Sequence, residues 1–366
     1  MGNENPTLLV TGISGNLGTR LLPLLADFRV IGVDLKPPAA AGCARFISMD
    51  LGLEESCREL FGILRDTGPV GVLHLAFVID PVRTGVLDHD RMWQINVAGT
   101  ARVMEAITEA NRDAPLVRSF IYPSSVSVYG SDLPEAVTED FPLGAHTLPY
   151  AIHKMQCDKV VQQRAPSLRG CSTYLLRPHI FVGASVENYL VGAFRGTPNG
   201  LSPRAARMRV QGKRLPCMLP YGRRYLENKI QFVHVDDMAR LLAYIIHRKE
   251  PEAQRLTVLN VAGRGEALTF AQCVEMAGGG LKRVPGKRAF RLILKMLWKL
   301  GISAIPPEAL PYMTGEYTMD TARLRKFLGT DYENVIHYTI ADAFRDSFTS
   351  SPTAPRAAAA PSVTAH

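Results

Sequence analysis

Short apolar runs recur through the first half of the chain and alternate with longer amphipathic stretches. The runs are rich in β-branched residues and lie at Leu8–Val10, Val30–Val33, Val70–Leu75, Ser119–Tyr122 and Thr173–Leu176. Consecutive runs are separated by enough residues for a helix, which is the pattern of repeated βαβ units. The sequence therefore predicts an α/β fold, a Rossmann-type doubly wound parallel sheet that binds its ligand beyond the carboxyl ends of the strands.

Two later runs, Gln231–Val235 and Thr257–Val261, flank a helix-like stretch and are expected to rejoin the same sheet. Residues 185–229 are rich in Pro, Gly and Arg without clear periodicity, which favours a substrate-covering insertion. We predict a dinucleotide-binding domain over residues 1–180, rejoined by about 230–262, and a smaller C-terminal substrate-binding lobe of residues 181–229 and 263–345. The Pro-, Ala- and Ser-rich residues 346–366 are predicted to form a disordered tail.

The composition narrows the class of protein. A chain of 366 residues with 46% hydrophobic residues can bury one large core or two associated ones. Its six cysteines are scattered singly without metal-ligand spacing, so we predict reduced thiols and no metal site. Because no stretch approaches the ~20 apolar residues of a membrane span and no leader pattern opens the chain, we predict a cytoplasmic protein.

The basic residues are concentrated in the second half of the chain. The net charge is +8, with −3 on residues 1–200 and +11 on the remainder. Such a field favours an anionic substrate or an anionic surface. No recognisable helix-turn-helix, zinc finger or base-stacking motif accompanies it, so nucleic acid is not predicted as a partner. The excess lies in two runs, Arg204, Arg207, Arg209, Lys213, Arg214, Arg223, Arg224 and Lys229, and Lys282, Arg283, Lys287, Arg288, Arg291, Lys295 and Lys299.

The segment Ala289–Leu300 combines basic and apolar residues at helical spacing. It has the pattern of an amphipathic helix that makes peripheral contact with a membrane. The same pattern fits a helix that packs on the substrate lobe while its basic side chains reach solvent. Both interpretations stay open at the level of sequence.

A glycine-rich turn follows the first predicted strand. It reads Thr11-Gly12-Ile13-Ser14-Gly15-Asn16-Leu17-Gly18 and leads into a helical stretch. Glycines between a strand and a helix allow backbone N–H groups to approach a pyrophosphate at the helix N-terminus. Asp34 ends the second strand, where a carboxylate accepts the adenine-ribose hydroxyls and repels a 2′-phosphate. The spacing therefore favours NAD over NADP as the cofactor.

Tyr150 and Lys154 stand four residues apart at the start of a predicted helix, so both side chains share one face. A nearby ammonium stabilises a tyrosinate, which suits Tyr150 as a proton-transfer group with Lys154 as its partner. Pro123-Ser124-Ser125-Val126-Ser127-Val128-Tyr129-Gly130 follows an apolar strand and places small hydroxyls at the same edge of the sheet. A serine there can stabilise a reacting carbonyl or alcohol oxygen.

With TGxxGxxG, an acid after the second strand, SSxxVYG and YxxxK in this order, the chain resembles the extended short-chain dehydrogenase/reductase family, of NAD-dependent epimerase/dehydratase type. The resemblance covers about residues 7–262. It implies catalytic roles for Ser125, Tyr150 and Lys154, and a homodimer formed through helices near 90–110 and 150–165. It also implies that the cofactor is held by Gly12, Gly15, Asn16, Leu17, Gly18, Asp34, Asp50, Leu51, Leu75, Ala76, Asn96, Tyr150, Lys154 and Pro178.

The chain also departs from the family pattern. Ser125-Val126 occupies the segment in which family dehydratases carry an Asp-Glu pair, so sugar dehydration is not expected. Ile180 and Ile230 stand where nucleotide-sugar epimerases typically have an Asn and an Arg toward the diphosphate. Arg207, Arg209, Arg223 and Arg224 are basic residues that could compensate.

The leading hypothesis is an NAD-dependent oxidoreductase or epimerase that transfers hydride at a secondary alcohol or ketone carbon, with a nucleotide sugar as one substrate class. The first alternative is a dehydrogenase or reductase of a hydrophobic, sterol-like alcohol at a membrane surface. The second is a non-catalytic protein that senses nicotinamide dinucleotides.

Overall fold

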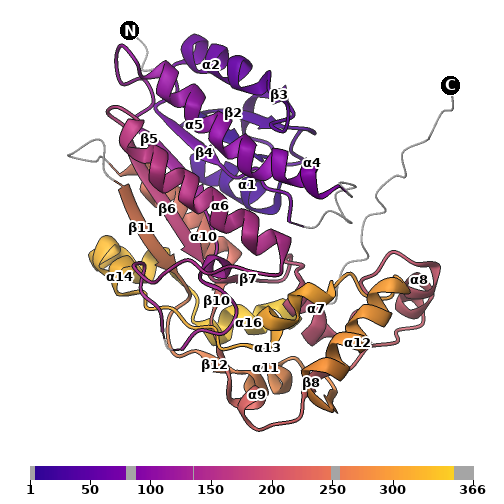
Figure 1. Ribbon diagram of the computed structural model, residues 1–366. Coiled ribbons are helices and arrows are strands. Elements are labelled where there is room, and N and C mark those ends of the chain that lie inside the picture. Colours follow the sequence, from indigo (N-terminus) through magenta and orange to yellow (C-terminus); the bar gives the residue numbers. More distant parts are fainter. Residues whose placement is uncertain (1–4, 80–87, 135, 249–255, 350–366) are drawn as a thin grey trace, which may run out of the picture.

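A seven-stranded parallel sheet forms the centre of the larger lobe in the computed structural model, which describes residues 5–79, 88–134, 136–248 and 256–349 (Figure 1). The strand order is β11-β6-β5-β4-β1-β2-β3. Its direction of winding reverses between β1 and β4, and this switch point is where open α/β sheets bind ligands. The strands are β1 (Thr7–Thr11), β2 (Arg29–Asp34), β3 (Cys43–Ser48), β4 (Gly71–His74), β5 (Ser119–Pro123), β6 (Ser172–Pro178) and β11 (Leu256–Val261).

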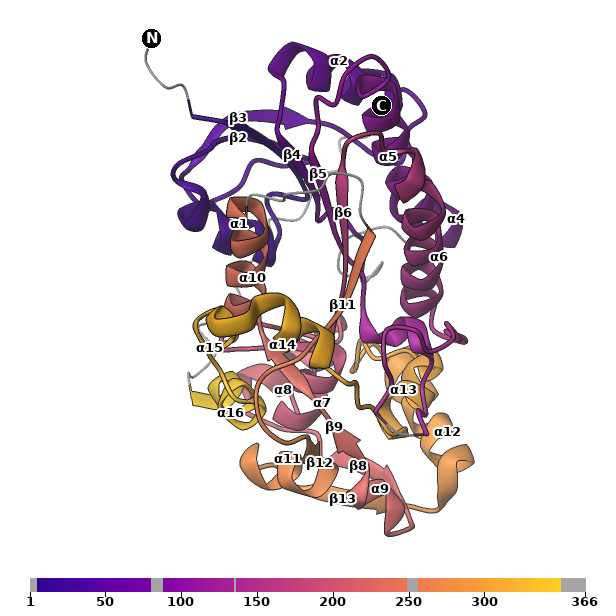
Figure 2. The ribbon, with the colours of Figure 1, turned by 90° about the vertical axis from the view of Figure 1, so that its left-hand side faces the viewer.

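Helices cover both faces of this sheet, because side chains along each strand alternate between the faces (Figure 2). Leu8 and Val10 of β1 pack in one core cluster, whereas Leu9 packs in the cluster on the other face. The first face is covered by α1 (Asn16–Leu21), α10 (Val235–His247) and α14 (Ala322–Leu328). The second face is covered by α2 (Ser56–Thr67), α5 (Gly99–Ala110) and α6 (Pro149–Arg164). The short helix α4 (His89–Trp93) precedes α5 in the chain.

The predicted Rossmann-type fold is confirmed, with two differences from the sequence analysis. The edge strand β3 was not predicted, because its residues are mostly exposed or half-buried and lack an apolar run. The prediction that Gln231–Val235 joins the main sheet is wrong. Instead, β10 (Phe232–His234) pairs with β7 (Ile180–Val182) in a separate two-stranded sheet. The second late run does return, as β11, and pairs with β6.

The smaller lobe is assembled from short elements around two apolar clusters. Its small sheets pair β13 with β8 and β12 with β9. The predicted domain boundaries stay predictions. The prediction of a disordered tail from residue 346 is wrong for its first four residues, which end α16, and residues 350–366 lie outside the described residues. The remaining elements are α7 (Tyr189–Arg195), α8 (Pro203–Val210), β8 (Cys217–Pro220), α9 (Arg224–Glu227), β9 (Lys229–Ile230), β12 (Leu268–Thr269), α11 (Phe270–Met276), β13 (Leu281–Val284), α12 (Gly286–Lys299), α13 (Leu310–Thr314), α15 (Tyr332–Val335) and α16 (Ile340–Thr349).

The amphipathic segment of the sequence analysis forms most of α12. Phe290 and Leu294 are buried in the smaller lobe, while Leu292 and Met296 are 68% and 54% exposed. The helix thus packs on the lobe by one side and presents apolar side chains to solvent on another. Within the described residues, none of the helices has the length and apolar character needed to cross a bilayer.

Candidate active site

The glycine-rich turn connects β1 to α1 at the switch point of the sheet. Gly12 has φ +70°, and a Cβ there would lie 2.4 Å from the backbone nitrogen of Ala76. A Cβ on Gly18 would lie 2.4 Å from the carbonyl oxygen of Ile13. These two positions therefore admit only glycine, and they bring the loop and α1 close to the strands. Gly12, Gly15, Asn16, Leu17 and Gly18 all line one cavity, an arrangement that fits a pyrophosphate at a helix N-terminus.

Asp34 lies beside this turn at the end of β2. Its carboxylate accepts hydrogen bonds from the backbone N–H of Ser14, at 3.0 Å, and of Leu35, at 2.7 Å. The acid is thereby fixed next to the glycine turn, although it does not line the cavity. The position fits an acceptor for ribose hydroxyls, and that role stays a prediction.

The other predicted cofactor residues fall into two groups. Leu75 and Pro178 line the cavity. Asp50, Leu51, Ala76 and Asn96 do not line it. Asp50 forms an ion pair with Arg91 and Leu51 is buried.

Asn96 is completely buried and acts on the backbone that follows β4. Its Oδ1 accepts from the Val78 N–H at 2.7 Å, and its Nδ2 donates to the Val78 carbonyl at 3.0 Å. We infer that Asn96 positions this segment rather than contacting a cofactor.

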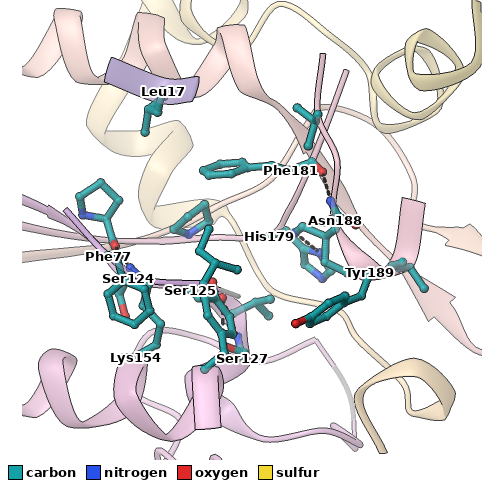
Figure 3. A pocket seen from close by; sticks show the side chains of 18 of the residues that line it. Leu17, Phe77, Ser124, Ser125, Ser127, Lys154, His179, Phe181, Asn188 and Tyr189 are labelled. Carbon is teal, nitrogen blue, oxygen red and sulfur yellow. Dashed lines mark hydrogen bonds between the residues drawn. The ribbon is translucent and has the colours of Figure 1, made fainter. Parts of the chain in front are cut away.

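Ser125, Tyr150 and Lys154 converge on the same cavity. Ser125 caps a short 3₁₀ turn, and its Oγ accepts hydrogen bonds from the N–H of Ser127, at 3.2 Å, and from the Ser127 hydroxyl, at 3.0 Å. The Ser125 hydroxyl lies close enough to the Tyr150 phenol to lower its pKa. Lys154 Nζ donates to the Pro123 carbonyl at 2.7 Å. Figure 3 shows Ser125 beside Ser127, with Lys154 next to the ring of Phe77.

The electrostatics of this group differ from the sequence prediction. Burial raises the pKa of Tyr150, and the nearby Ser125 hydroxyl offsets this only in part. Burial also lowers the pKa of Lys154 to about 8, opposed by nearby Cys157 and Asp158. The Lys154 ammonium lies 3.8 Å from the centroid of Phe77, whose π-face stabilises a cation. Since Pro123 and Phe77 hold Lys154, this arrangement does not produce the lowered Tyr150 pKa that the sequence analysis expects.

The titration of Lys154 gives a prediction for stability. Its pKa is about 8 in the folded chain against an ordinary 10.5, so between these pH values the unfolded chain binds more protons. The Lys154 contribution to the free energy of unfolding therefore rises with pH across this window. In urea unfolding, the free energy of unfolding of the wild type relative to that of Lys154→Met should increase by on the order of 3 kcal/mol from the lower to the upper end of this pH window. The exposed Lys159→Met on the same helix serves as control, and a pH-independent difference for Lys154→Met would contradict the prediction.

A buried ion pair holds the catalytic segments together. Arg177 on β6 and Asp158 on α6 are 2% and 0% exposed, and two guanidinium nitrogens lie 2.9 Å from the carboxylate oxygens. The Ser124 hydroxyl donates to the same carboxylate at 2.9 Å, and Arg177 donates to the Tyr129 hydroxyl at 2.8 Å. Asp158 was missed in the sequence analysis, although it follows Lys154 at helical spacing.

The cavity has a volume of about 410 Å³ and extends from the glycine turn into the smaller lobe. Among the described residues that line it, Lys154 and Glu187 are the charged ones, since burial lowers the pKa of His179 to about 3. The sequence analysis assigned the substrate to this lobe but singled out Ile180 alone among the lining residues at this end, because they come from separate segments without a common motif. They are Leu148, His179, Ile180, Phe181, Val186, Asn188, Tyr189, Leu190, Ala309, Tyr312, Met313 and Tyr317.

The basic residues expected to compensate for the missing diphosphate contacts lie elsewhere. Arg209 donates to the Gly200 carbonyl at 2.9 Å, Arg223 pairs with Glu227, and Arg224 pairs with Asp132. Neither these three nor Arg207 lines the cavity. The described residues also contain no cluster of three or more His, Cys, Asp or Glu side chains suited to a metal ion.

A parallel sheet with this switch point, joined to a glycine turn and a Ser-Tyr-Lys group in one cavity, places the protein among the short-chain dehydrogenases/reductases. Residues 8–262 match the model of the NAD dependent epimerase/dehydratase family, and the chain belongs to that family. The predicted family and the prediction of an NAD-dependent enzyme are thereby confirmed. These matches favour neither alternative, the enzyme for a hydrophobic, sterol-like alcohol or the non-catalytic sensor.

Individual relatives agree with this placement. The UDP-glucose 4-epimerase of Erwinia amylovora is 27% identical over 294 residues, which cover 75% of this chain and 83% of the relative. The UDP-glucose 4-epimerase 4 of Oryza sativa subsp. japonica is 30% identical over 253 residues, 64% of this chain and 65% of the relative.

Solved structures share the fold. A UDP-glucuronic acid 4-epimerase from Bacillus cereus, in complex with a UDP-sugar analogue and NAD, matches with a TM-score of 0.62 and 17% identity over 93% of this chain and 98% of that chain. A short-chain dehydrogenase/reductase superfamily protein from Agrobacterium tumefaciens with bound NAD matches with a TM-score of 0.60 and 22% identity, over 93% and 95%.

Proposed function

We propose that the protein transfers hydride between NAD and a secondary alcohol or ketone carbon, with Ser125, Tyr150 and Lys154 as the catalytic residues. The observation that carries this proposal is one continuous cavity with the glycine turn at one end and these three side chains along its wall. Gly12, Gly15 and Gly18 would hold the pyrophosphate, and Asp34 the adenine ribose. NAD supplies the hydride acceptor and donor when it is bound.

Each of the three side chains has a distinct role in the proposal. Tyr150, whose pKa is raised, is protonated at neutral pH and donates its proton to a ketone oxygen in the reductive direction. In the oxidative direction Tyr150 must first lose this proton, and its phenolate then accepts the hydroxyl proton of the substrate. Ser125, whose hydroxyl lies close enough to Tyr150 to lower its pKa, holds the same substrate oxygen. Lys154, whose pKa is about 8, remains mostly charged at pH 7 and supplies positive potential next to the oxygen.

The first candidate substrate is a nucleotide sugar, and the outcome is epimerisation if the keto form stays bound and accepts hydride on its other face. The relatives named UDP-glucose 4-epimerase support this class. A second candidate is a hydrophobic secondary alcohol, which the largely apolar lobe end of the cavity favours. Ile180, at the position of the diphosphate-contacting Asn, is one of these lining residues.

The experiment that tests the function separates these candidates. Purified protein with NAD is incubated either with UDP-glucose or with a steroid secondary alcohol. Formation of UDP-galactose without net NADH supports the epimerase, and stoichiometric NADH with the steroid supports the dehydrogenase. Loss of either activity in Ser125→Ala assigns it to this cavity. Turnover that is unchanged in this variant would refute the proposed site.

We also propose a homodimer formed through α5 and α6, which lie side by side on one face of the sheet. Trp93 at the end of α4 is 38% exposed next to these helices, and its Nε1 donates to Gln156 of α6. Light scattering of the eluting protein should give twice the chain mass of 40.2 kDa. A single-chain mass at micromolar concentration would contradict the proposal. A cytoplasmic location is likewise proposed, supported by the six free thiols.

A further inference from the structure

One surface of the smaller lobe takes no part in the cavity and combines exposed apolar with basic side chains. We define the α12–α8 surface as the exposed side of α12 together with Leu201 and the exposed side of α8. Figure 1 places both helices at the same end of the smaller lobe. The Gly200 N–H donates to the Ile302 carbonyl at 2.9 Å, and the Ser202 N–H donates to the Gly301 carbonyl at 3.0 Å. The end of α12 and the start of α8 are therefore joined.

The apolar part of this surface is a stripe rather than scattered residues. Leu292, Met296 and Leu300 follow one another at a spacing of four residues and are 68%, 54% and 47% exposed. Leu201, on the segment bonded to the end of α12, is 67% exposed. Contiguous exposed apolar side chains of this kind mark an interaction site. Packing within the chain does not account for them, because α12 already buries Phe290 and Leu294 on its other side.

The charged part of the surface has one sign. Residues 276–307 contain seven Lys and Arg and no Asp or Glu, and residues 196–216 contain five and none. The basic residues next to the stripe on α12 are all exposed and have no ion pair within the described residues. They are Arg288, Arg291, Lys295 and Lys299.

We propose that the α12–α8 surface docks on an anionic lipid bilayer. Leu292, Met296, Leu300 and Leu201 would enter the interfacial region, and the neighbouring basic side chains would pair with lipid phosphate and carboxylate groups. Nucleic acid is the weaker match for the same charge, because the exposed stripe is aliphatic and offers no series of stacking aromatics. A bilayer is the partner that uses both the apolar and the basic residues.

This docking places the cavity close to the lipid. The buried side of α12 packs in one cluster with Leu148, Tyr150, Tyr312 and Met313, which line the cavity. The side of α12 that faces away from the exposed stripe therefore packs with residues that line the lobe end of the cavity. The docking itself holds whichever substrate class the enzyme uses.

The test is co-sedimentation of the full chain with sucrose-loaded vesicles of phosphatidylcholine alone, or of phosphatidylcholine with about 30% phosphatidylserine. We expect binding to the mixed vesicles only. The double variant Lys295→Glu/Lys299→Glu should lower the partition coefficient at least about tenfold, as should Leu292→Asn/Met296→Asn. The matched control, Arg325→Glu/Lys326→Glu, reverses two exposed charges on α14, which packs on the main sheet apart from α12, and should bind like the wild type (Figure 1).

The altered side chains are exposed, so the melting temperatures of the variants should match that of the wild type, which separates lost docking from lost folding. Three results would overturn the proposal: no pelleting of the wild type with anionic vesicles, equal pelleting of wild type and both α12 variants, or loss of binding in the α14 control. Binding of RNA by the wild type, without binding to the anionic vesicles, would also overturn it.

Discussion

Tyr150→Phe is expected to lower kcat by about two to four orders of magnitude, the usual contribution of a general acid or base. The substitution removes the phenol oxygen and leaves the ring, which packs edge-on against Phe77. The fold and the glycine turn are untouched, so NAD binding should remain. Initial rates on UDP-glucose or on the steroid alcohol, whichever the wild type converts, together with NAD titration by fluorescence, measure both quantities.

The control for Tyr150→Phe removes a phenol oxygen elsewhere. Tyr244 lies on α10 and does not line the cavity. Its hydroxyl donates a hydrogen bond to Asp331 at 3.1 Å. Tyr244→Phe should keep the wild-type rate. A Tyr150→Phe enzyme within about threefold of the wild-type rate would show that another group moves the proton.

Asp158→Asn is expected to destabilise the protein by about 3–5 kcal/mol, the cost of leaving a buried charge without its partner. Arg177 is 2% exposed and has no route to solvent for its guanidinium. Because Ser124 and Arg177 both bond this carboxylate, β5, β6 and α6 lose their common anchor. Urea unfolding at pH 7 measures the change in the free energy of unfolding.

The comparison pair lies on the surface. Glu109 and Arg112 form an ion pair with side-chain exposures of 42% and 69%. Glu109→Gln should therefore change the free energy of unfolding by less than about 1 kcal/mol. Equal losses for Asp158→Asn and Glu109→Gln would mean that the buried pair does not anchor the site.

The parts of the site that follow from sequence are those encoded by neighbouring residues. The turn from Gly12 to Gly18 can be predicted from sequence because its glycines, strand and helix are contiguous, and the pairing of Tyr150 with Lys154 can be predicted because they are one helical turn apart. The orientation of Lys154 cannot be predicted in this way, because it depends on Phe77 and Pro123. The same holds for the cavity end in the smaller lobe, whose residues meet only through tertiary packing. The edge strand β3 was not predicted because it buries too little apolar surface to require a run of hydrophobic residues.

The position of β11 has a consequence for synthesis of the chain. This strand occupies one edge of the main sheet and pairs with β6 through six consecutive residue partners, Leu256 to Val261. Nearly eighty residues of the smaller lobe and α10 separate the two strands. While the ribosome is still making that stretch, β6 is an open edge rich in apolar side chains, which favours aggregation. Slow translation between residues 179 and 255 would therefore lower the yield of folded protein more than slow translation after residue 261.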